Sequence, residues 1–211
     1  MYCPAHFRED RPEVLAALIE RYPLATVVTS GPEGLGADHV PMMYDPARGP
    51  HGTLVGHVAR SNPLWRVPAT QELLVVFQGP STYVSPNWYA TKQATGKVVP
   101  TWNYAVVHAW CTLSAVRDPA SVLQIVTELT DRHEASQPHP WRVDDAPVEY
   151  TGQMATLAVG IELAVKRMQG KWKVSQNQPP ENRETAIRGL LGEGTEGAAE
   201  MAELVRTHAP R

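Results

Sequence analysis

The stretch spanning residues 54–65, LVGHVARSNPLW, runs from a β-branched pattern into a histidine, an arginine and a polar turn. Arg60, Ser61 and Asn62 bring hydrogen-bond donors together just before a proline. A guanidinium fork matches phosphate geometry, and a serine hydroxyl with turn amides can complete the ring of donors. This pattern predicts an anion site. The simpler interpretation is that Arg60 is a solvated charge and His57 a hydrogen-bonded core residue.

A second cluster, KVVPTWNY at residues 97–104, combines polar and aromatic side chains in alternation. On a strand, Thr101 and Asn103 share one face, while Trp102 and Tyr104 share the other. One face can donate hydrogen bonds to a ligand while the other packs, and core packing is the commoner role for any one tryptophan.

A third cluster, KWKVSQNQ at residues 171–178, places Lys171, Lys173 and Ser175 on one side of an extended chain. The amide-rich run at 176–178 follows directly. The lysines are interpreted either as ligand contacts or as solvated charges.

Other site motifs are missing or incomplete. The chain has no glycine-rich dinucleotide or Walker-type loop and no G-x-S-x-G elbow. Cys3 and His6 have a C-x-x-H spacing, but a zinc site needs further ligands. His133 and Glu134 begin an H-E-x-x-H pattern in which Gln137 replaces the last histidine. We therefore expect no metal site and assign no catalytic residue, since the carboxylates form no acid and base pair.

The composition is that of a globular chain. Its 211 residues are 43% hydrophobic and 19% charged, with a net charge of −3 and a pI near 6.2. No run could span a bilayer and the N-terminus does not resemble a signal peptide, so we expect a cytoplasmic protein. Cys3 and Cys111 are isolated thiols rather than a disulfide framework. The acidic balance does not favour nonspecific nucleic-acid binding.

Nineteen prolines and fifteen glycines indicate many turns between short strands. We predict a helix over 12–22 after an Asp10 cap, and another after Asp118 and Pro119. A bend is expected at Pro100. The predicted strands are 24–30, 35–44, 53–59, 72–78, 97–116 (one strand or two) and 157–168. Further helices are predicted over 62–67, 181–191 and 198–208, with 147–156 ambiguous and 79–96 an ordered loop.

Six stretches in order resemble one known family: YCPAHFRED, YPLATVVTS, GHVARSNPLW, VVFQGPSTYVSPNWY, GKVVPTWNY and GKWKVSQNQP. The resemblance is to the PaiB family, described as FMN-binding negative transcriptional regulators. It implies an FMN-binding split β-barrel, mainly β with peripheral helices (α+β), that forms a homodimer with FMN at the subunit interface. Residues 1–180 would form the barrel domain with embedded helices, and 181–211 a C-terminal helical segment packed on it.

The resemblance also implies which residues contact FMN. Arg60 would bind the phosphate, and Lys97 and residues 100–103 would lie on a facing strand. Trp110 and Cys111 depart from the family at a position where a glycine-containing pair is expected. The full predicted set is His57, Val58, Ala59, Arg60, Ser61, Asn62, Lys97, Pro100, Thr101, Trp102, Asn103, Lys173, Gln176 and Asn177.

Three functions follow as hypotheses. The first is an FMN-binding protein that acts as a flavin-dependent oxidoreductase, in which FMN supplies the redox chemistry. The second is a transcriptional regulator, although no helix-turn-helix or basic stripe supports DNA binding. The alternative is a haem-binding or haem-degrading split barrel, with His57, His108 and His133 as candidate axial ligands.

Overall fold

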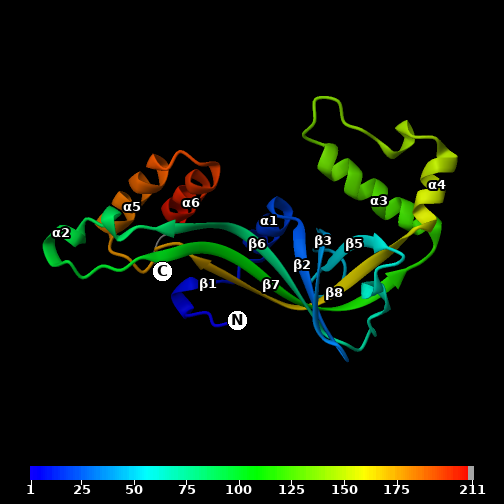
Figure 1. Ribbon diagram of the computed structural model, residues 1–211, viewed down its shortest axis with the longest axis horizontal. Helices are drawn as coiled ribbons and strands as arrows, with labels where there is room; N and C mark the ends of the chain where they lie inside the picture. The colour runs from blue at the N-terminus through cyan, green and yellow to red at the C-terminus, as the bar shows by residue number, and fades with distance from the viewer. Residues whose placement is uncertain (209–211) are drawn as a thin grey trace. The chain divides into compact units, whose positions relative to one another are not determined.

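The computed structural model describes residues 1–208, whose elements are labelled in Figure 1. The strands form an antiparallel sheet in the order β3-β2-β6-β7-β8-β5-β4, and β1 pairs with β8. The strands are β1 Arg8–Glu9, β2 Leu24–Gly31, β3 Gly34–Pro41, β4 Met43–Asp45, β5 Thr53–Ala59, β6 Leu73–Val84, β7 Thr101–Val116 and β8 Ala158–Lys173. The helices are α1 Pro12–Arg21, α2 Thr91–Thr95, α3 Pro119–Glu134, α4 Val148–Thr156, α5 Pro180–Gly192 and α6 Glu196–Thr207, with 3₁₀ turns η1 Ala5–Phe7, η2 Pro63–Arg66, η3 Pro86–Trp88 and η4 Val143–Asp145.

The chain divides into two compact units. Unit 1 contains Met1–Leu18, Gln78–Val107 and the chain from Gln169 onward, and unit 2 contains Ile19–Phe77 and His108–Met168. The divisions fall inside α1, β6, β7 and β8. The boundary expected at residue 180 stays a prediction. None of the helices in residues 1–208 is long and apolar enough to cross a membrane.

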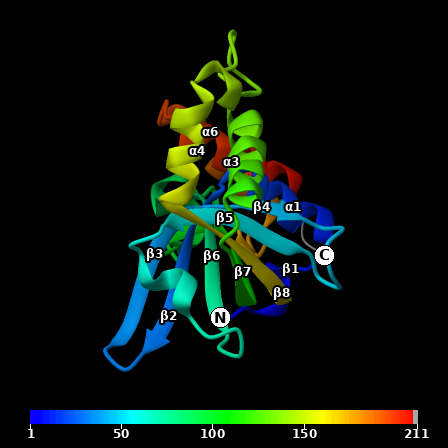
Figure 2. The same cartoon turned by 90° about the vertical axis from the view of Figure 1, so that its right-hand side faces the viewer.

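In unit 2, helix α3 packs against the sheet beside β5. Ile125 and Leu129 of α3 form a buried cluster with Met43 and Val55. A Cβ at Gly160 of β8 would lie 2.6 Å from Cδ1 of Ile125 and 3.1 Å from Cβ of Val116, so glycine lets α3 approach this strand closely. Figure 2 shows α3 and α4 side by side next to β5. Helix α3 therefore covers one face of the β5 and β8 pair, and α4 packs beside α3.

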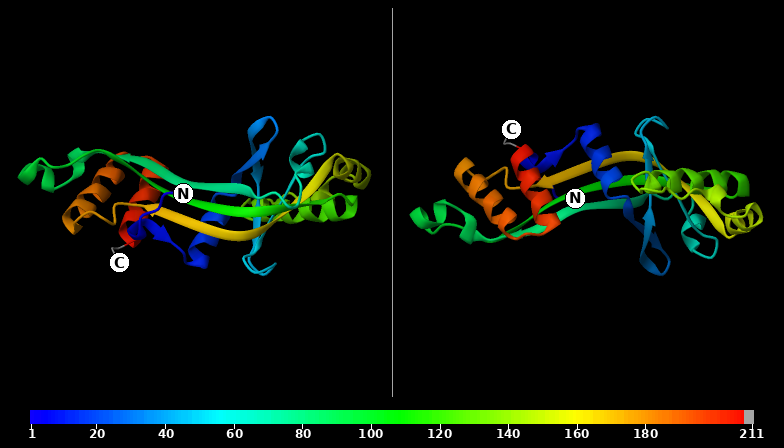
Figure 3. Two further views of the ribbon diagram at one scale, coloured as in Figure 1. Left: turned by 90° about the horizontal axis from the view of Figure 1, so that it is seen from below. Right: turned by 90° about the horizontal axis from the view of Figure 1, so that it is seen from above.

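In unit 1, α5 and α6 pack on each other as adjacent helices, which the two views of Figure 3 also show. Their contact faces are fully buried at Ala186, Leu190, Met201 and Val205. Gly189 of α5 lies against the ring of Trp88, where a Cβ would be 2.3 Å from the indole. This packing holds η3 against α5.

Most predicted elements are confirmed. Helix α1 begins at Pro12, β2 and β5 agree with the expected strands, and α3 begins at Pro119 with an Asp118 carboxylate that accepts from the Ser121 amide at 2.9 Å. The ambiguous segment 147–156 contains helix α4.

Three expectations about strands were wrong. The strand expected over 35–44 is interrupted at Met42, whose amide donates to the Pro23 carbonyl instead. The segment expected as a loop from residue 79 continues β6, which lies between β2 and β7 in the sheet, to Val84. The strand expected over 97–116 begins only at Thr101, directly after Pro100, which has no amide hydrogen to donate to the sheet.

Candidate functional site

Arg60 is the residue of the predicted phosphate site with the most contacts. It follows β5, where Ala59 pairs with Ala158 of β8. Its Nε donates to the carbonyl of Thr156 at 2.6 Å and its Nη2 to that of Ala158 at 3.1 Å. Its amide donates to Leu157. The guanidinium therefore caps the C-terminal end of α4, where a cation is favoured, and its remaining terminal nitrogen has no hydrogen bond within residues 1–208.

The turn after β5 is fixed by Asn62. Its Oδ1 accepts from the Leu64 amide at 2.7 Å and caps η2, while its Nδ2 donates to Asp38 Oδ1 at 2.7 Å. Ser61 is exposed, as is Ala59, whereas Val58 is buried in the opposite face of the strand from His57. Of this stretch, Ser61 is the residue whose hydroxyl is open to a ligand.

An arginine and tryptophan cluster lies beside this turn. The Trp65 ring has the guanidinium carbons of Arg66 and Arg117 at 4.9 and 4.8 Å from its centroid, and its Nε1 donates to the Arg60 carbonyl at 3.0 Å. In the described chain neither Arg66 nor Arg117 forms an ion pair with a carboxylate. Such weakly hydrated, unneutralised guanidiniums are suited to a phosphate.

A cavity of 590 Å³ lies next to this cluster. Arg66, Leu64 and Asp38 line it together with the β2 and β3 hairpin. Its volume falls within the range of small-molecule and cofactor sites. The sequence pattern predicted a ligand site at this turn, but it did not predict that Arg66 and Arg117 belong to the site. Arg66 could have been noticed from its place in the same segment, but no local signal links Arg117 to it.

The predicted residues of unit 1 form a separate group of contacts. The Lys173 ammonium donates to the Thr101 hydroxyl and, at 2.6 Å, to the Trp102 carbonyl. Burial lowers the pKa of Lys173, with a smaller effect from the Lys171 charge. Lys173 is therefore bound to the first residues of β7.

Two side-chain amides of unit 1, those of Asn103 and Gln176, form hydrogen bonds with other groups of the protein. Asn103 is buried and donates to the Ser175 hydroxyl at 2.9 Å. Gln176 accepts from the Val174 amide at 2.8 Å and donates to the Trp172 carbonyl. The other predicted residues, Lys97, Pro100 and Asn177, are exposed and form no side-chain hydrogen bond within the described residues. Their roles as FMN contacts stay predictions.

The three candidate haem ligands lie in different surroundings in unit 2. His57 and His133 line one cavity of 340 Å³, whereas His108 packs against the Trp110 ring with centroids 5.9 Å apart. Trp110 is also covered by the Arg167 guanidinium at 3.4 Å. No group of three or more His, Cys, Asp or Glu side chains in residues 1–208 could hold a metal ion.

The chain is similar to several known proteins. It is 32% identical to an uncharacterized protein of Emericella nidulans, over 98% of this chain and 96% of that protein. It is 29% identical to the protease synthase and sporulation protein PAI 2 of Bacillus subtilis, over 97% of this chain and 96% of that protein. This second match confirms the PaiB resemblance.

The structure is similar to that of a FAD and heme binding protein from Mycobacterium smegmatis, with a TM-score of 0.56 and 16% identity over 85% of this chain and 78% of that one. The likeness confirms the split β-barrel fold. A family described as "Putative FMN-binding domain" matches residues 1–167, so FMN is the cofactor of the group. The chain therefore belongs to this FMN-binding family.

Proposed function

We propose that this protein binds FMN beside Trp65 and acts as a flavin-dependent oxidoreductase. The observation that carries the proposal is the pair of guanidiniums on Trp65, Arg66 and Arg117, which have no carboxylate partner in residues 1–208. Arg66 lines a cavity of cofactor size. Arg60 and Ser61 of the preceding turn add donors for the phosphate.

The residues present fit a flavin phosphate. Two cations with planar donor forks can bind a dianion without displacing an existing ion pair, which lowers the cost of binding. Asn62 holds the turn in place through Asp38 and Leu64, so the donors are positioned before the ligand arrives. When bound, FMN supplies the hydride or electron transfer, and the protein binds and orients it.

Redox chemistry is favoured over direct DNA binding. The similar structure from M. smegmatis is named for FAD and haem, which supports a redox cofactor in this fold. The net charge of −3 does not favour extensive contacts with a nucleic-acid backbone. A regulatory role of the kind that the PaiB resemblance implies would then follow from the state of the flavin.

We also propose that two copies pair, with FMN between them. In unit 1, Trp102 and Tyr83 meet edge to face with centroids 6.2 Å apart while remaining 57% and 46% exposed. Val99, nearby in sequence, is also exposed. Exposed aromatic pairs of this kind are enriched at protein interfaces, and a two-fold dimer is the commonest way to cover them.

FMN binding is tested by equilibrium titration, following the quenching of flavin fluorescence. Arg66→Ala and Arg117→Ala should each weaken binding about tenfold or more, because each loses a charge-assisted hydrogen bond to the phosphate. Arg132→Ala, which removes an exposed arginine of α3, is the matched control and should bind like wild type. Failure of the wild-type protein to bind FMN, or unchanged affinity in both variants, would refute the site.

The redox role is tested on the FMN complex without oxygen. Addition of NADH or NADPH should bleach the long-wavelength flavin absorption, and admission of an electron acceptor should restore it. A complex that neither reductant reduces faster than free FMN would contradict the proposed activity while leaving cofactor binding intact.

Dimerisation is tested by light scattering on the intact chain. Trp102→Glu should lower the mass from that of a pair to that of one chain, because a carboxylate would be buried in an apolar contact. Val148→Glu, at an exposed apolar residue of α4, should not change the mass. A wild-type protein with the mass of one chain would exclude the dimer.

A further inference from the structure

Two further cavities lie in unit 2 against helices α3 and α4, and no residue of the Trp65 cluster lines them. Two cavities of 340 and 210 Å³ share the side chains of His57, Val126 and Trp141. None of the residues that line the 590 Å³ cavity lines either of them. The two cavities are therefore neighbours that meet around one histidine and one tryptophan.

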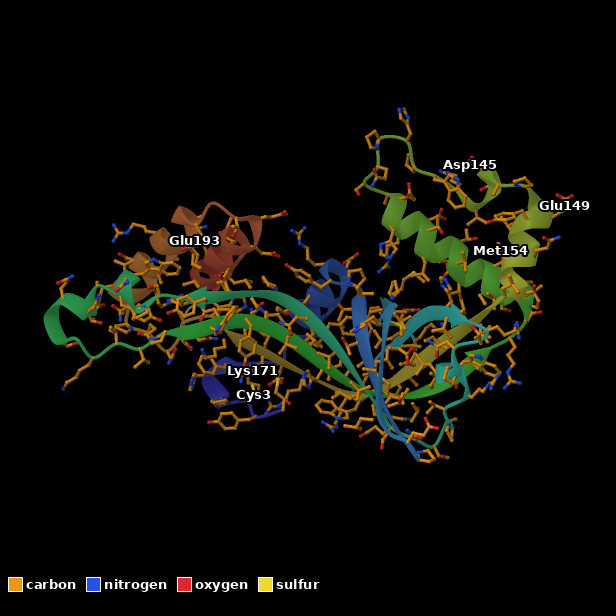
Figure 4. All side chains as sticks on the ribbon, in the orientation of Figure 1. Cys3, Asp145, Glu149, Met154, Lys171 and Glu193 are labelled. Carbon is orange, nitrogen blue, oxygen red and sulfur yellow. The ribbon has the colours of Figure 1, made fainter. Side chains whose placement is uncertain are left out.

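The lining of the smaller cavity is almost entirely apolar and aromatic. Met154, which Figure 4 labels on α4, lines it together with the Tyr150 ring and aliphatic side chains of both helices. Trp141 forms a wall of both cavities, and its amide is anchored by the Glu134 carboxylate at 3.0 Å. The ring is thus held at the cavity by a backbone contact and not only by packing.

His57 lines both cavities and carries an unsatisfied polar atom in its ring. Its Nδ1 is buried and has no hydrogen-bond partner among residues 1–208. Burial lowers the pKa of His57, so its imidazole is neutral near pH 7. A buried nitrogen without a partner costs free energy that a bound ligand can recover.

We infer that the space under α3 and α4 binds a small, neutral, planar aromatic molecule of one or two rings that carries a single hydroxyl or ring N–H. The rings match the flat surfaces of Trp141 and Tyr150 and the aliphatic lining. The hydroxyl or N–H donates to the neutral imidazole of His57. An ionised ligand is disfavoured, because the smaller cavity has no charged side chain in its lining to replace water.

The larger cavity is the opening of the site. It adds His133, Glu134 and Thr130 to the shared residues. His133 is exposed, so this side is polar and reaches solvent. A ligand therefore enters past α3 and places its apolar rings against α4. This site does not depend on FMN binding, since it uses none of the Trp65 cluster.

The test compares 2-naphthol with naphthalene by equilibrium dialysis against the full chain without added FMN. Wild type should bind both and prefer 2-naphthol about fivefold, the effect of one hydrogen bond. His57→Phe keeps a flat ring but removes the acceptor, so it should bind both probes equally. Thermal melting of each variant shows that it is folded.

A pair of matched variants tests the position of the site. Met154→Trp fills the cavity and should weaken both probes about tenfold or more. Leu157→Trp adds the same ring three residues away, at a side chain 60% exposed and outside the lining, and should bind like wild type. FMN titration of both folded variants should be unaffected, which separates this site from the flavin site.

Three outcomes would overturn the inference: no binding of either probe by wild type, equal binding by Met154→Trp and wild type, or a preference for 2-naphthol that persists in His57→Phe. Haem is the remaining outcome. If haem displaces 2-naphthol with a shifted Soret band, and the band returns to its free-haem position in His57→Phe, the cavity is a haem site and the assignment to a neutral aromatic ligand is wrong.

Discussion

The side-chain amide of Asn103 donates a hydrogen bond to the hydroxyl of Ser175, and both side chains are almost completely buried. Asn103→Ala should therefore lower the free energy of unfolding by about 1–3 kcal/mol, because it leaves a buried hydroxyl with one partner fewer. Urea denaturation measures the change. Asn87→Ala, at an amide whose contact with Lys92 is exposed, should cost much less. Equal losses in the two variants would contradict the assigned role of the buried pair.

Ser175 has a left-handed backbone, with φ of +63°. Ser175→Ala keeps that conformation and loses the hydrogen bond, whereas Ser175→Gly loses the bond but relieves about 1 kcal/mol of backbone strain. The glycine variant should therefore be the more stable of the two by about that amount. If the alanine variant is as stable, the backbone at this position carries no strain.

The lowered pKa of His57 makes stability depend on pH. The unfolded chain binds a proton on this residue near the ordinary value of 6.5, while the folded chain binds it only at lower pH. Above the pKa that His57 has in the unfolded chain, the free energy of unfolding should be at its full value. It should fall as the pH drops from that pKa toward the lower pKa of the folded chain. Between about pH 7.5 and pH 5.5, His57→Phe should lose less stability than wild type.

Part of this pH dependence should remain in His57→Phe, because burial also lowers the pKa of His108. His51→Phe, in the exposed loop before β5, is the control and should follow the wild-type curve. Urea unfolding at each pH gives the three curves. Coincident curves for His57→Phe and wild type would show that His57 titrates in the folded protein as it does in the unfolded chain.

Asp118 begins the helix that covers the cavity under α3 and α4. Its carboxylate accepts hydrogen bonds from both the amide and the hydroxyl of Ser121, which holds the pKa of that carboxyl below its usual range. Asp118→Ala should lower the midpoint of thermal or urea unfolding, and Asp118→Asn should restore most of the loss. A similar loss in both variants would mean that the charge, and not the cap, stabilises α3.

The two thiols should differ in reactivity. Cys111 is fully buried, and burial raises its pKa to about 12, whereas Cys3 is half-buried beside the Gly170 carbonyl. A disulfide reagent at mildly alkaline pH should modify Cys3 first and reach Cys111 only after unfolding, since the thiolate is the reactive form. Cys3→Ser should abolish the fast reaction and Cys111→Ser should keep it. Rapid labelling of Cys3→Ser would indicate that β7 opens locally.

Local signals explain why so many elements were predicted correctly. The Asp118–Pro119 pair and Pro12 mark helix starts by themselves, because caps and first-turn prolines act within one turn. The Asp10 carboxylate, expected to cap the first helix, accepts from Arg8 at 2.9 Å instead. The wrong predictions lie where a contact between residues far apart in the sequence determines the local structure. Strand β6 continues through Gly79 as a neighbour of β7 in the sheet, and no pattern within β6 records that pairing.

In the candidate site, too, contacts between residues far apart in the sequence could not be predicted from local patterns. The turn from Arg60 to Asn62 was visible as a cluster of donors, but the hydrogen bonds that occupy Arg60 come from the end of α4, nearly one hundred residues later. Arg117 reaches Trp65 only through the fold. Residue types therefore indicated what chemistry was available, while the pairing of distant segments determined which side chains remain free for a ligand.

The capping of α4 by Arg60 has a consequence for regulation. The same guanidinium contacts the helix that lines the aromatic cavity and belongs to the turn proposed for the phosphate. Only a ligand that displaced the carbonyls at the end of α4 would also move Arg60, and thermodynamic linkage would then require the two ligands to change each other's dissociation constants by the same factor. A ligand that fills the cavity without displacing that end leaves the turn after β5 as it is.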